Sequence, residues 1–182
     1  MRKVNYHCAI SLDGYVACKD GSFDCFAMQG PHVSDFLATL GSYDVALMGR
    51  RTYEVGLKYG VTNPYPSMKT YVFSRTIRES PDANVTIVSA DGPELVRKLK
   101  EQDGKDIWVV GAGDLATTLF AEGLVDEVTL KINPVLLGEG IPMISHLKAP
   151  VPLDLIGSKA YDNGVVLLSY RLGASSTKEL RP

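Results

Sequence analysis

Three short segments of this 182-residue sequence carry the residue types that bind phosphate groups. They are residues 111–115 (GAGDL), 49–52 (GRRT) and 74–75 (SR), and each follows an apolar run. Glycines before a helix leave backbone N–H groups free to bind an anion, and guanidinium groups form paired hydrogen bonds with phosphate. Each segment alone is more typical of a tight turn or an exposed salt bridge. Together they predict a site for a ligand with several phosphates.

Residues 111–116 (GAGDLA) also satisfy the G-x-G-x-x-A pattern of a Rossmann dinucleotide site. Such a site needs an acidic residue at the end of the next strand, ~20 residues further on, to hold the adenine ribose. Here that strand ends in Asn133 and Pro134, and the acids Asp126 and Glu127 stand at its start. We therefore expect a phosphate loop in a different fold.

Alternating strands and helices must position these segments. Apolar runs predict strands at 3–10, 43–49, 69–75, 84–90, 105–111 and 126–138, and helical spacing predicts helices at 32–40, 50–57, 92–104 and 113–123. Residues 152–172 predict two strands joined by a turn at 162–164 (DNG). The pattern indicates an α/β fold in which helices flank a mainly parallel central sheet that ends in an antiparallel C-terminal hairpin.

Length and composition indicate one domain, residues 1–172, followed by a flexible tail at 173–182. The net charge of -2 and the lack of a long Lys/Arg cluster argue against a nucleic-acid partner. No apolar run reaches the ~18 residues of a membrane span, so we expect a cytoplasmic protein. The three cysteines and three histidines follow no metal-ligand spacing, so no metal site is predicted.

Five segments carry a resemblance to known reductases. Residues 48–54 (MGRRTYE), 73–76 (FSRT) and 108–115 (WVVGAGDL) resemble, in order and spacing, the NADPH-binding segments of dihydrofolate reductases. Residues 11–17 (SLDGYVA) and 126–143 (DEVTLKINPVLLGEGIPM) are similar to the reductase domain of riboflavin biosynthesis. The chain is identified as a stand-alone member of the riboflavin-biosynthesis reductase family, within the dihydrofolate-reductase-like superfamily.

The resemblance implies an NADPH-dependent oxidoreductase acting on a CH–NH or C=N bond of a pterin- or pyrimidine-like molecule, as 5-amino-6-(5-phosphoribosylamino)uracil reductase does. It places the pyrophosphate and nicotinamide along Gly111, Ala112, Gly113, Asp114 and Leu115. The other phosphates would meet Gly49, Arg50, Arg51 and Thr52, the adenosine end would meet Ser74 and Arg75, and Ala9 and Val16 would flank the nicotinamide. Family likeness and the apolar segment 165–170 (VVLLSY) also predict a homodimer.

The chain departs from both relatives on the substrate side, where residues 56–69 replace the family's ribose-phosphate insertion. We expect Asp24 and Asp35 to serve as catalytic and substrate-binding acids, and Lys131 to contact the substrate. Each has an ordinary alternative as a turn residue, a solvated helix residue or a sheet-surface residue. A non-catalytic nucleotide-binding module of the same fold is the alternative function.

Overall fold

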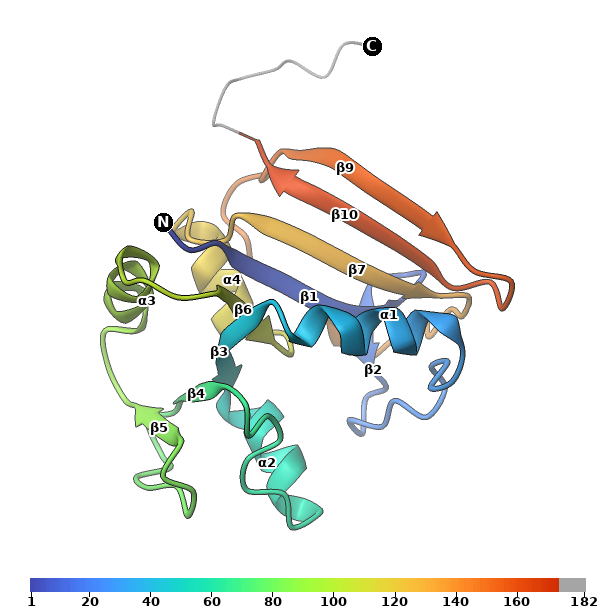
Figure 1. Cartoon of the computed structure of the whole chain (residues 1–182). Coiled ribbons are helices and arrows are strands. Elements are labelled where there is room, and N and C mark those ends of the chain that lie inside the picture. The colour runs from blue at the N-terminus through green and yellow to red at the C-terminus, as the bar shows by residue number, and fades with distance from the viewer. Residues whose placement is uncertain (174–182) are drawn as a thin grey trace.

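Eight strands form one sheet at the centre of the molecule (Figure 1). The computed structural model describes residues 1–173, so the predicted tail falls outside the described residues except for Gly173. In spatial order the strands are β5 (Val85–Val88), β4 (Lys69–Phe73), β3 (Tyr43–Gly49), β6 (Asp106–Val110), β1 (Val4–Ser11), β7 (Glu127–Asn133), β10 (Val166–Leu172) and β9 (Leu153–Ala160). The strands from β5 to β7 pair in parallel, whereas β10 is antiparallel to both of its neighbours. The predicted fold class is confirmed.

Helices cover both faces of the sheet. They are α1 (Pro31–Leu40), α2 (Arg50–Lys58), α3 (Gly92–Glu101) and α4 (Asp114–Ala121). Alternate side chains of a strand point to opposite faces, so Ile107 packs with α3 and α4, while Trp108 packs against Phe36 of α1. Tyr53 of α2 packs beside Met48 in a third apolar cluster.

The C-terminal hairpin turns at Gly164, whose φ of 82° is accessible to glycine at little cost. The sequence predicts that residues 165–170 of this hairpin form an apolar surface that would be costly to expose to water. In the structure Val165 is buried and Val166–Tyr170 are half-buried, because β10 lies between β7 and β9. The exposed apolar side chains are instead Leu153, Leu155 and Ile156 of the edge strand β9.

Two short strands form in segments where the sequence predicted no strand: β2 (Tyr15–Ala17) pairs with β8 (Ile141–Pro142). Asp13 holds the two segments together, since its carboxylate accepts hydrogen bonds from the backbone N–H groups of Leu137 and Gly138. Residues 11–17 and 126–143, which carry the resemblance to riboflavin reductases, therefore meet in space.

Candidate functional site

A cavity of about 1450 Å³ runs along the carboxyl ends of the parallel strands. Its lining includes the segments that follow β3, β4, β5 and β6, because parallel strands deliver their ends to one edge of the sheet. Every residue predicted to bind the cofactor lines this cavity: Ala9, Val16, Gly49, Arg50, Arg51, Thr52, Ser74, Arg75, Gly111, Ala112, Gly113, Asp114 and Leu115. Residues 89–93, after β5, line it too and were not predicted.

Three helices begin at this cavity. The N-cap residues of α2, α3 and α4 are Gly49, Asp91 and Gly113, and none of the three helices has a side-chain hydrogen bond at its N-cap. The first backbone N–H groups of these helices are thus left for a ligand, and each helix brings the positive end of its dipole. This half of the cavity, between α2, α3 and α4, suits an anion.

Two glycines shape the loop before α4, each for its own reason. Gly111 has a φ of 86°, and a Cβ there would lie 2.2 Å from Thr52 Oγ1, so the loop packs directly on the first turn of α2. Gly113 has a φ of 85°, and a Cβ there would meet nothing within 4 Å. Since Gly113 lines the cavity, that open space lets a ligand approach the backbone.

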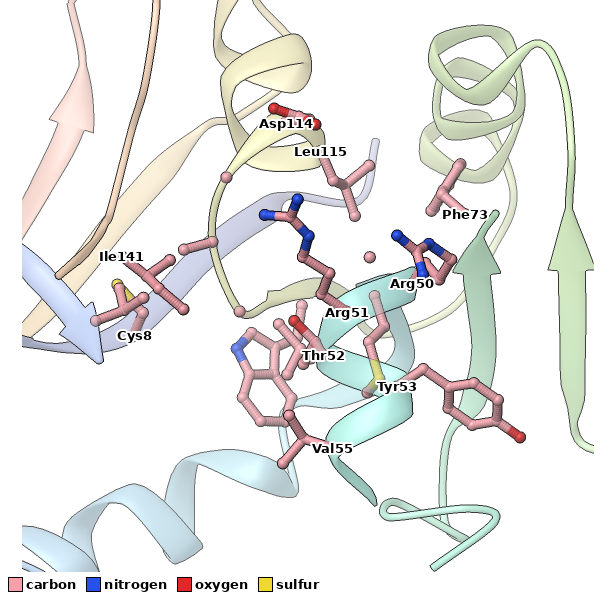
Figure 2. A pocket seen from close by; sticks show the side chains of 18 of the residues that line it. Cys8, Arg50, Arg51, Thr52, Tyr53, Val55, Phe73, Asp114, Leu115 and Ile141 are labelled. Atoms are coloured by element: carbon pink, nitrogen blue, oxygen red, sulfur yellow. The ribbon is translucent and has the colours of Figure 1, made fainter. Parts of the chain in front are cut away.

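The arginines of the cavity differ in what they bind. Arg50 donates from Nη1 to both carboxylate oxygens of Glu54, at 2.8 and 3.0 Å. Arg51 and Arg75 are exposed and form no ion pair within residues 1–173. Figure 2 shows Arg51 extending from the first turn of α2 into the cavity. Arg51 and Arg75 are therefore the cations available to a phosphate.

Ser74 builds the turn that presents Arg75. Its hydroxyl oxygen accepts hydrogen bonds from the backbone N–H groups of Thr76, at 3.2 Å, and Ile77, at 2.8 Å. The residue is buried, and its hydroxyl proton remains for an acceptor such as Thr76 Oγ1, 3.4 Å away, or a ligand oxygen. Ser74 thus has a structural role besides the binding role expected of it.

The other half of the cavity, bordered by β1, β7 and α1, is mostly apolar, and Phe26, Phe36, Tyr65 and Trp108 line it. Lys131 also lines it, as the sequence predicted, and its Nζ donates to the backbone oxygen of Ala27 at 2.8 Å. Burial lowers the pKa of Lys131 from its ordinary value.

His7 and Cys8 line the same half and were missed by the sequence reasoning. Burial, assisted by the charge of Lys131, lowers the pKa of His7 to about 4, so its imidazole is neutral at pH 7. Burial raises the pKa of the Cys8 thiol to about 12, so it is not a thiolate nucleophile. Their position in the sequence could have identified them. Both belong to β1, a strand inside the sheet whose residues line the cavity.

Neither predicted acid lies in the cavity lining. Asp35 accepts hydrogen bonds from Lys159 Nζ at 2.5 Å and Tyr161 Oη at 2.6 Å, and these partners lower the pKa of its carboxyl. Its carboxylate is therefore engaged in an ion pair and a hydrogen bond outside the cavity lining. Asp24 is exposed in the loop between β2 and α1, although its neighbour Phe23 does line the cavity. The catalytic and substrate-binding roles of these two acids stay predictions, and the cavity lining does not support them.

Within residues 1–173, no helix has both the length and the apolar character to cross a membrane. Among the same residues, no group of three or more histidine, cysteine, aspartate or glutamate side chains could hold a metal ion.

Comparison with known proteins gives matches over nearly the whole chain. The RibD C-terminal domain model matches residues 2–167. The uncharacterized protein YyaP of Bacillus subtilis is 35% identical over 181 residues, which cover 93% of this chain and 94% of that protein. A putative riboflavin biosynthesis protein from a Shewanella species has a TM-score of 0.82 at 25% identity, over 94% of this chain and 99% of that one. Dihydrofolate reductase from Enterococcus faecalis, complexed with NADP(H), has a TM-score of 0.67 at 15% identity, over 94% and 97% of the two chains, which shows a shared fold.

Proposed function

This chain belongs to the RibD C-terminal domain family, and we propose that it is an NADPH-dependent reductase of a small conjugated or heterocyclic molecule. The observation that carries the proposal is the anion-binding half of the cavity. There, three helix N-termini without side-chain caps, the open approach at Gly113 and the cations Arg51 and Arg75 lie along one wall. A cavity of about 1450 Å³ has room for a dinucleotide and a second small molecule.

We assign the lining residues to the parts of the dinucleotide from one end to the other. The loop at 111–115 and the N-terminus of α2 would hold the pyrophosphate, and Arg75 with the turn of Ser74 would hold the ribose 2′-phosphate. Ala9 and Val16 would border the nicotinamide. When bound there, NADPH supplies a hydride to the substrate.

Lys131 would orient the substrate beside that ring. It pairs with Ala9 in the register of β7 with β1, so its side chain starts from the strand next to the proposed nicotinamide contact. No carboxylate lines this half of the cavity within residues 1–173, so Lys131 or water would deliver the proton. A substrate that needs a carboxylate partner fits this half poorly.

The test combines binding with turnover. We expect calorimetry to show NADPH binding to the purified protein, and NADPH absorbance to fall when a suitable acceptor is added. Failure to bind NADPH would refute the proposal. Binding without oxidation across a broad panel of pterins, pyrimidines and conjugated carbonyl compounds would favour the alternative, a non-catalytic NADPH-binding module, which the missing carboxylate makes a real competitor.

A further inference from the structure

We propose that the apolar half of the cavity takes an aryl-substituted conjugated ketone, with its carbonyl oxygen bound by Lys131. The inference rests on the proposed function for the reaction, but its recognition chemistry comes from the cavity itself. Aryl ketones differ in chemistry from the pterins and phosphorylated pyrimidines that the resemblance suggests.

The charges of the cavity lining are divided unequally between its two halves. The carboxylates that line the cavity within the described residues are Asp91 and Asp114, which stand at the starts of α3 and α4, in the anion-binding half. In the apolar half, His7 is neutral at pH 7 and Lys131 is the charged side chain. A half-buried cation without a neighbouring acid favours a ligand that is an acceptor or an anion, and disfavours an aminopyrimidine that needs a carboxylate.

Apolar side chains line the same half of the cavity as Lys131. Phe26 and Trp108 are almost fully buried, and Phe36 packs edge-on against Trp108 with ring centroids 5.6 Å apart. At the rim, Phe23, Met28 and Leu37 also line the cavity, yet 42%, 58% and 59% of their surfaces remain exposed. Apolar side chains gathered around an opening gain free energy when an apolar ligand covers them. An aromatic ring would cover these apolar side chains and gain free energy by doing so, whereas a charged ribose phosphate would not.

Lys131 starts from a strand next to the proposed nicotinamide contact. Its pairing with Ala9 places it one strand away from the proposed nicotinamide contact. One of its ammonium hydrogens is committed to Ala27 O, and two remain for a ligand oxygen. In the reduction, hydride adds to the β-carbon and a proton from water adds to the α-carbon. The C=C bond becomes a single bond, and NADPH becomes NADP⁺. Lys131 would offset the negative charge that develops on the carbonyl oxygen.

The test measures binding without cofactor, so that it does not depend on turnover. The probe is 4-phenylbutan-2-one, the saturated product of such a reduction, titrated by calorimetry. Trp108 is the single tryptophan of the chain, so a change in its emission reports binding in this cavity. We expect the ketone to bind at least tenfold more tightly than dihydrobiopterin. Butan-2-one, which lacks the ring, should bind roughly a hundredfold more weakly than the aryl ketone.

Two lysines in one row of the sheet provide a matched pair of variants. Leu167 of β10 pairs with both Lys131 and Lys159, so the two lysines point to the same face, but only Lys131 lines the cavity. Lys131→Met should weaken the aryl ketone by about tenfold or more, Lys131→Arg should retain binding, and Lys159→Met should leave it unchanged. Thermal melts would check that each variant is folded.

Tighter binding of dihydrobiopterin than of the ketone would overturn the proposal, as would a folded Lys131→Met variant that binds the ketone like the wild type. Ketone binding by a protein that fails to bind NADPH would refute the reductase function while supporting this recognition chemistry. Oxidation of NADPH with 4-phenylbut-3-en-2-one, reduced by Lys131→Met, would support both.

Discussion

At the scale of single residues, Arg75 is the side chain best placed to distinguish NADPH from NADH. It is exposed at the end of β4, beside the turn built by Ser74, and it forms no ion pair within residues 1–173. A guanidinium–phosphate hydrogen bond contributes about 1.5–3 kcal/mol, so NADPH should bind roughly ten- to a hundredfold more tightly than NADH. Arg75→Ala should remove most of that difference, as measured by titration with both cofactors.

Arg78→Ala is the matched control, because Arg78 is exposed three residues further on and does not line the cavity. It should leave the preference unchanged. Equal dissociation constants for the two cofactors in the wild type would contradict the assignment of Arg75 to the 2′-phosphate.

Gly113→Val should abolish cofactor binding in a protein that still folds. The new side chain would enter the open space through which the dinucleotide reaches the backbone. The φ of 85° adds strain of about 1–3 kcal/mol, which a domain with a stability of about 5–15 kcal/mol survives. Gly123→Val controls for strain, since Gly123 also has a positive φ and open surroundings but lies outside the cavity lining. Circular dichroism and NADPH titration would compare the two variants. A folded Gly113→Val protein that binds NADPH as tightly as the wild type would show that the loop is only a turn without a role in cofactor binding.

His7 makes the stability of the fold depend on pH. Its pKa is about 4 in the folded protein and about 6.5 when unfolded, so the unfolded chain binds more protons between these values. The stabilisation is complete above pH 6.5 and is lost as pH falls towards 4, by up to about 3 kcal/mol. Urea denaturation across this range should show a shallower decline for His7→Phe. The same decline in wild type and variant would assign the effect to other groups, and His146→Gln is the exposed control.

At the scale of secondary structure, the pairing of β2 with β8 depends on one close approach. A Cβ at Gly140 would lie 2.4 Å from the backbone oxygen of Ala17. Gly140→Ala should therefore separate these strands and lower the free energy of unfolding by about 1–3 kcal/mol. At Gly157 in β9, a Cβ would meet only Ser169 Cβ, 3.9 Å away, so Gly157→Ala is the control. Chemical denaturation would measure both, and equal effects would show that the contact relaxes freely.

The features of the fold that the sequence predicted correctly depend on residues that lie close together along the chain. Apolar runs and helix-start residues located the parallel strands, and the rule that parallel strands end at one edge brought the residues after β3, β4 and β6 together. The comparable segment after β5, at 89–93, was missed because it lacks an arginine and a glycine pair.

What could not be predicted depends on partners far along the chain. Asp35 stood at the expected place in a helix, but its partners Lys159 and Tyr161 lie 124 and 126 residues away. The ion pair and the hydrogen bond of this carboxylate are therefore set by side chains that the hairpin brings, and the sequence around Asp35 gives no sign of them. The short pairing of β2 with β8 was missed for the same reason, since two- and three-residue strands have no periodicity to detect.

At the scale of the whole molecule, we propose a homodimer formed through β9. All eight residues of this edge strand are exposed, and Leu153, Leu155 and Ile156 present apolar side chains together with unpaired backbone groups. Light scattering at micromolar concentration should give the mass of two chains, and Leu155→Lys should give the mass of one. Leu136→Lys, in an exposed loop, should remain dimeric. A monomeric wild type would refute the proposal.

The central position of β1 means that the sheet cannot be completed early in synthesis. Its two neighbours, β6 and β7, follow it by roughly a hundred residues or more, and β10 must arrive later to cover the outer edge of β7. Until then the apolar N-terminal strand has two open edges on the nascent chain. Contacts so distant in sequence slow folding and prolong exposure to aggregation. The yield of active protein in a cell should therefore depend on how well ribosome-associated chaperones shield this first strand.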